Sequence, residues 1–147
     1  MLMSREAIAA MIPHSGAMCL LDGVLAWDAS TIRCSSRSHR AEDNPLRVAG
    51  ELSAWCGVEY AAQAMAIHGV LAGNVGARPR LGYLASLRKV SCYRRRLDDL
   101  EGDLVVSAER LMGEEARVIY RFEVGVGKIE VLSGQAAVVL EAAPGRA

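Results

Sequence analysis

A carboxylate lies within an otherwise largely apolar stretch of the sequence. Residues 50–69 (GELSAWCGVEYAAQAMAIHG) read as a helix that is apolar or small on almost every side, with Glu59 at its middle. Such a helix is normally surrounded by protein, where an ionised Glu must be paired or protonated. We therefore expect Glu59 to be buried and to give and take protons. The structural alternative is an ion pair between Glu59 and an arginine across a dimer.

Histidine is the residue type best suited to share proton transfer with Glu59, because imidazole titrates near neutral pH. His14 follows a proline just before the first predicted strand and is the partner we predict. His39 is the alternative, and we expect His68 only to end the helix, with Gly69 closing it. Gln63 lies one helical turn after Glu59 and would orient its carboxylate or bind water.

Positive charge is concentrated late in the chain. The cluster consists of Arg88, Lys89, Arg94, Arg95 and Arg96. Such a cluster can steer an acidic macromolecule to a site. Four acidic residues follow within 98–103, so a merely solvated face is the alternative.

The elements that must position these groups follow from periodicity and turn residues. The sequence predicts a short helix over 5–11, strands over 17–27 and 31–39, the helix over 50–69, and strands over 81–93, 103–112, 115–124 and 128–140. The late strands are joined by tight turns, which favours an antiparallel meander. An apolar helix cannot lie on one flat sheet with its other side wet. We therefore expect an α+β fold whose sheet wraps around the helix.

Composition excludes several classes of function. The 147 residues are 52% hydrophobic and predict one folded domain over 1–147. Lys plus Arg equals Asp plus Glu at 17 each, which gives no general attraction to nucleic acid. No apolar run approaches the roughly 20 residues of a membrane span. The N-terminal residues do not read as a secretory signal, and the four scattered cysteines predict reduced thiols in a cytoplasmic protein without a metal site.

Three segments resemble the hotdog-fold 3-hydroxyacyl-ACP dehydratases, and most closely their relatives in aryl polyene biosynthesis clusters. They are 12–28 (IPHSGAMCLLDGVLAWD), 57–69 (GVEYAAQAMAIHG) and 82–103 (GYLASLRKVSCYRRRLDDLEGD). The resemblance implies a hotdog fold that dimerises edge to edge. It also implies dehydration of 3-hydroxyacyl thioesters on acyl carrier protein, in fatty acid-like or polyketide and aryl polyene synthesis, with no cofactor.

The resemblance assigns roles to several residues. Glu59 and His14 would be catalytic; Gln63, Gly50 and Asn44 would contact substrate; and the basic cluster would dock the acidic carrier protein. The chain departs from the family before the helix, where residues 43–50 lack the catalytic histidine of a His-Phe-Pro turn.

This departure leaves three functions open. The chain is an independent dehydratase, an acyl thioesterase on the same fold, or a degenerate subunit that supports a partner dehydratase in a hetero-oligomer.

Overall fold

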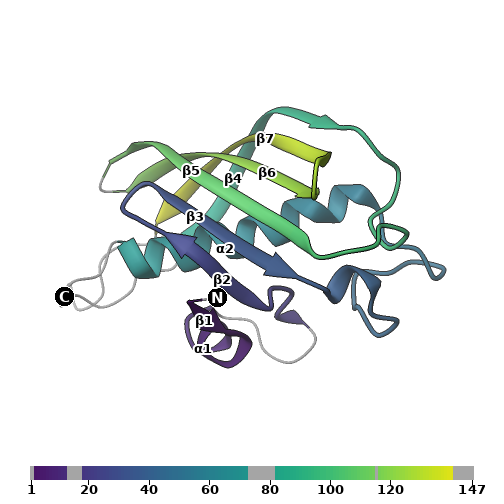
Figure 1. Ribbon diagram of the computed structural model, residues 1–147. Helices are drawn as coiled ribbons and strands as arrows, with labels where there is room; N and C mark the ends of the chain where they lie inside the picture. Colours follow the sequence, from purple (N-terminus) through teal and green to yellow (C-terminus); the bar gives the residue numbers. More distant parts are fainter. Residues whose placement is uncertain (1, 13–17, 73–81, 115, 141–147) are drawn as a thin grey trace.

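The structure is a computed structural model that describes residues 2–12, 18–72, 82–114 and 116–140. Its elements are β1 (Met3–Ser4), α1 (Arg5–Ala9), β2 (Gly23–Trp27), β3 (Thr31–Ser36), η2 (Ser38–Arg40), η3 (Ala54–Cys56), α2 (Gly57–Ala72), β4 (Gly82–Cys92), β5 (Leu104–Gly113), β6 (Arg117–Val126) and β7 (Ile129–Leu140). The strands form one antiparallel sheet in the order β1-β2-β3-β5-β6-β7-β4. Figure 1 shows this sheet curving over α2. The predicted sheet around a central helix is confirmed.

The long helix is shifted along the chain from the predicted 50–69. Residues 48–51 instead form a tight turn, in which Ala49 and Gly50 adopt positive φ of 52° and 79°. Backbone bonds of 2.8 Å and 3.0 Å join Val48 and Glu51 across it. Two successive residues of positive φ define the two-residue turn that matches strand twist. The chain then enters α2 through η3, where the Ser53 side chain accepts the N–H of Trp55 at 3.2 Å.

Of the strands after α2, β6 alternates regularly between the two faces of the sheet, whereas residues 84–89 of β4 are all exposed. On β6, the side chains of Val118, Tyr120, Phe122 and Val124 are buried. Arg121 and Glu123 between them, and Arg117 just before them, are exposed. Because successive side chains of a strand point to opposite faces, the buried set faces α2 and the exposed set lies on the other face. We call that other face the outer face. The predicted hairpin around Gly113 is confirmed, since β5 pairs with β6.

The N-terminal region differs from its prediction. The side chain of Ser4 accepts the N–H of Ala7 and caps α1. Of the strand predicted over 17–27, only β2 at 23–27 forms. β1 was not predicted, because two residues paired with the edge of β2 carry no periodic signal.

Candidate functional site

Glu59 lies in the first turn of α2 and its side chain is exposed. Our prediction that it is buried in an all-apolar helix is therefore wrong for the single chain. An acidic residue at this end of a helix is stabilised by the helix dipole. Its surroundings are nonetheless apolar, because Trp55 one turn earlier is 56% exposed and Val58 beside it is half-buried. Glu59 is thus a carboxylate at an apolar, uncovered surface.

One face of α2 continues this apolar surface along the helix. Val58, Ala62, Ala66 and Val70 recur every fourth residue and are all half-buried. Residues at this spacing lie above one another on a helix. At the edge of the sheet, Leu87 of β4 is 40% exposed although it pairs with the core residue Ala136. We call these five residues the open face.

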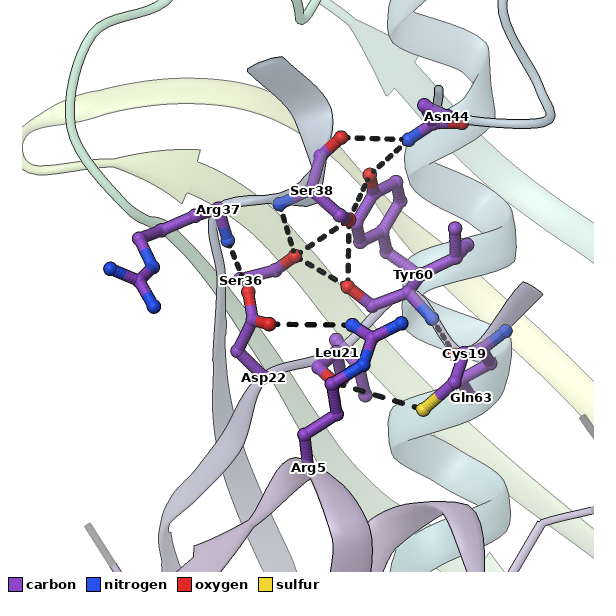
Figure 2. Close-up of polar contacts among 11 residues, drawn as sticks. Arg5, Cys19, Leu21, Asp22, Ser36, Arg37, Ser38, Asn44, Tyr60 and Gln63 are labelled. Carbon is purple, nitrogen blue, oxygen red and sulfur yellow. Dashed lines mark hydrogen bonds and ion pairs between the residues drawn. The ribbon is translucent and has the colours of Figure 1, made fainter. Parts of the chain in front are cut away.

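Gln63 lies one turn after Glu59 but is only 3% exposed. Its side-chain oxygen accepts the N–H of Leu20 at 2.9 Å, and its nitrogen donates to the carbonyl of Met18 at 2.7 Å. The side-chain amide of Gln63 therefore holds residues 18–20, which precede β2, against α2. Figure 2 shows Gln63 facing this segment. That it contacts substrate stays a prediction.

Asn44 and Tyr60 belong to a polar network that also lies against α2 (Figure 2). The Asn44 amide nitrogen donates to the carbonyl of Ser38 at 2.9 Å and to the Tyr60 hydroxyl at 3.1 Å, while its oxygen accepts the N–H of Leu46 at 2.9 Å. The Tyr60 and Ser38 hydroxyls share a further bond of 2.7 Å. These bonds fix the loop that leads to α2. A substrate contact by Asn44 likewise stays a prediction.

The described histidines are both buried and held by other partners. His14 lies outside the described residues. His39 donates from Nε2 to the carbonyl of Leu100 at 3.0 Å, and its Nδ1 has no hydrogen-bond partner among the described residues. Burial lowers the pKa of His39. Among the described residues, neither imidazole forms a hydrogen bond or ion pair with Glu59.

His68 does not lie at the end of its helix. α2 continues to Ala72, so the prediction that Gly69 closes it is wrong. The Nε2 of His68 donates to the carbonyl of Asp28 at 2.9 Å, and its Nδ1 accepts the hydroxyl of Tyr120 at 2.7 Å. Burial lowers the pKa of His68 and favours the neutral ring that this bonding requires. His68 thus ties α2 to the turn after β2 and to β6.

Asp98 is a further organising residue, and sequence reasoning overlooked it. Only 5% of its side chain is exposed, and it forms ion pairs with Arg96 and, at 3.6 Å, with Arg47. It also accepts the N–H of Leu52 at 2.9 Å. The hydrogen bond from Arg96 is the main cause that holds the pKa of Asp98 well below its usual range. Arg47 also donates to the carbonyl of Gly50 at 2.6 Å, so this cluster fixes the tight turn before α2.

The basic cluster is divided between two places. Arg88 and Lys89 are exposed on β4, whereas residues 94–96 follow it and lie beside the start of α2. There, Ala54 donates its N–H to the carbonyl of Arg95 at 3.0 Å, and Ser53 forms a bridge with Arg96. Arg95 and Arg96 both form ion pairs with Glu51. Carrier docking by these residues stays a prediction.

No helix in the described part of the chain is long and apolar enough to cross a membrane. Within the same residues, no three His, Cys, Asp or Glu side chains come together in a group that could hold a metal ion.

The curved antiparallel sheet around α2 defines the hotdog class of folds, as comparison with solved structures confirms. The dehydratase heterocomplex ApeI:P from Xenorhabdus doucetiae matches with a TM-score of 0.77 and 20% identity, over 92% of this chain and 91% of the other. A thioesterase from Haemophilus influenzae matches with a TM-score of 0.65 and 11% identity, over 96% and 92%. A putative thioesterase from Silicibacter sp. TM1040 has a TM-score of 0.66 and 13% identity, over 96% and 94%.

Sequence comparison is more specific. The family model ApeP-like, described as ApeP dehydratase, matches residues 6–144. The chain therefore belongs to the ApeP-like dehydratase family, and the predicted family is confirmed. None of the curated proteins compared with the chain matches it significantly.

Proposed function

We propose that this protein dehydrates 3-hydroxyacyl chains carried as thioesters on an acyl carrier protein, with Glu59 transferring the proton. Membership of a dehydratase family supports the reaction class. The observation that carries the proposal is the position of Glu59, a carboxylate beside an apolar surface that can accommodate an acyl chain. The proton on C2 passes to a base, the C3 hydroxyl leaves with a proton as water, and a C2–C3 double bond forms.

We further propose that a second hotdog subunit covers the open face, and that the imidazole that works with Glu59 is His14, as predicted from the sequence, or a histidine of that subunit. Covering this apolar surface would desolvate the carboxylate and strengthen its interaction with the reacting atoms. His39 and His68 are less suitable for this role, because both are buried and bonded elsewhere. The relative ApeI:P is a heterocomplex, which makes a different hotdog chain the preferred partner over a second copy.

The carrier protein would dock near residues 94–96, which lie beside the start of α2. Arg94 is exposed and forms no ion pair within the described residues. Replacing Arg94 and Arg95 by Glu should weaken turnover of carrier-bound substrate but spare a short N-acetylcysteamine thioester. The matched control is Lys128→Glu in the turn between β6 and β7. Equal losses on both substrates would argue against docking here.

The experiment that tests the function separates elimination from hydrolysis. The chain is incubated with a 3-hydroxyoctanoyl carrier thioester, alone and mixed with hotdog dehydratase subunits of the same organism. We expect an unsaturated thioester to form, and mixing to raise its rate of formation. Release of free thiol without the unsaturated product would instead identify a thioesterase. A chain that stays inactive in every mixture would contradict the proposal.

A further inference from the structure

A depression on the outer face of the sheet has no part in the site around Glu59. It holds about 340 Å³ and lies over β4, β6 and β7 beside the end of β5. Its lining includes Arg88, Met112, Glu114, Arg117, Ile119 and Ala137. We call it the outer depression. Its volume is at the lower end of the range for ligand sites, roughly 300–1,000 Å³.

Strand register explains the shape of the outer depression. Ala137 of β7 lies between Ile119 of β6 and Ser86 of β4 in one row across the sheet. Met112 of β5 extends the row beyond Ile119. The small side chains of Ser86 and Ala137 therefore lie next to the large apolar side chains of Ile119 and Met112. Ala137 forms the floor and is 5% exposed, although it lies on the face away from α2.

The charged residues of the outer depression lie on either side of that row. Arg88 pairs with Gln135 in the row on one side, and Arg117 pairs with Val139 in the row on the other. From strand spacing and rise, their Cα atoms are separated by about 10 Å across the sheet and roughly 13 Å along it. Two extended arginine side chains can approach a common ligand from these positions.

Neither arginine has a carboxylate partner within 4.0 Å in the described part of the chain. By contrast, Arg121 on the same face forms an ion pair with Glu109 on the neighbouring strand β5. Glu114 donates its backbone N–H to the carbonyl of Arg117 at 2.7 Å, yet its carboxylate forms no ion pair with any described residue. The described lining of the outer depression therefore contains two guanidinium groups and one carboxylate, an excess of positive charge.

We infer that the outer depression binds an amphipathic anion, a carboxylate or phosphate monoester with a short apolar body. Its head would lie between Arg88 and Arg117, because guanidinium groups bind these anions through paired hydrogen bonds. Its body would lie on Ala137 against Ile119 and Met112. This binding is separate from dehydration, because the sheet lies between the outer depression and α2.

The test is titration of the full chain with four probes of one chain length, followed by calorimetry and by NMR chemical shifts. Octanoate and octyl phosphate are expected to bind, and octanol and octylamine to bind at least about tenfold more weakly. Tighter binding of octanoate than of octyl phosphate would identify a carboxylate as the natural head group, and the reverse order would identify a phosphate. Binding of neither anion, or equal binding of octylamine, would overturn the inference.

Variants locate the binding. Arg88→Gln with Arg117→Gln should weaken octanoate binding at least about tenfold, while the control Arg121→Gln leaves it unchanged. Ala137→Leu should abolish binding with both charges intact, because it fills the floor. Shifts should appear at Ile119 and Ala137. Shifts at Ala62 and Ala66, or loss of binding in Glu59→Gln, would place the probe on the open face and overturn the inference.

Discussion

Glu59 and Gln63 lie one turn apart on α2, but one side chain is exposed and the other is 3% exposed. Gln63 points toward the segment before β2 and bonds to the backbone of Met18 and Leu20. Glu59 points toward the surface beside Trp55 and the open face. Gln63 therefore positions the segment before β2, whereas the carboxylate of Glu59 remains accessible for proton transfer.

Gln63→Leu should lower the free energy of unfolding by about 1–3 kcal/mol, because it leaves buried backbone groups without a partner. Urea denaturation measures the change. Gln135→Leu is the matched control, since Gln135 lies half-buried on the outer face without a side-chain bond in the described structure. Its effect should stay within about 0.5 kcal/mol. Equal midpoints for wild type and Gln63→Leu would contradict the role given to the amide.

Tyr120→Phe should also destabilise the protein, by about 1–3 kcal/mol, because the Nδ1 of buried His68 would lose its donor. The same substitution at Tyr93, which is 59% exposed, is the control. Thermal or urea unfolding should separate the two variants. If Tyr120→Phe and Tyr93→Phe have the same unfolding midpoint, the stability of the protein does not depend on the bond between the Tyr120 hydroxyl and His68.

Stability should fall as the pH is lowered from about 7 through 6.5 and below. Burial lowers the folded-state pKa of His39. As the pH falls, His39 therefore binds a proton in the unfolded chain at a higher pH than in the folded chain. This proton uptake favours unfolding. His39→Gln keeps a donor for the carbonyl of Leu100 without titrating. Its urea midpoint should therefore depend less on pH between 7.5 and 5. Parallel pH profiles for the variant and wild type would show that His39 makes no contribution.

Asp98→Asn should destabilise the turn before α2, because the amide loses the charge that pairs with Arg47 and Arg96. Hydrogen bonds to charged groups contribute roughly 1.5–3 kcal/mol, and a loss of that order is expected in urea unfolding. Asp99→Asn changes the neighbouring exposed carboxylate and is the control. Identical stability of the two variants would remove Asp98 from its organising role.

The sequence predicted β6 well because its side chains alternate between core and solvent from Val118 to Val124. The start of α2 was misplaced because Ala49 takes a positive φ, which nothing about an alanine indicates. Exposure of Glu59 was missed for another reason. Ala62 and Ala66 are as apolar as core residues, although they are only half-buried. Apolar type alone does not distinguish a core face from one left open to a partner.

The interactions of the predicted site residues depended on distant parts of the chain. Gln63 was recognised as an unusual polar residue on the helix, but its partners lie more than forty positions earlier. The hydroxyl of Tyr60 likewise bonds to Ser38 and Asn44, which lie well before it in the chain. Such pairings depend on how β2 and β3 pack against α2, which local patterns do not specify.

The most direct test of the proposed chemistry is the turnover of Glu59→Gln on a 3-hydroxyacyl carrier thioester, compared with Glu123→Gln on the outer face. Because Glu59 is exposed, the variant should keep its thermal stability. Loss of a positioned acid–base group typically costs about 10²–10⁴-fold in rate, so formation of the unsaturated thioester should fall at least about 100-fold, while Glu123→Gln matches wild type. Wild-type turnover in Glu59→Gln would contradict the account.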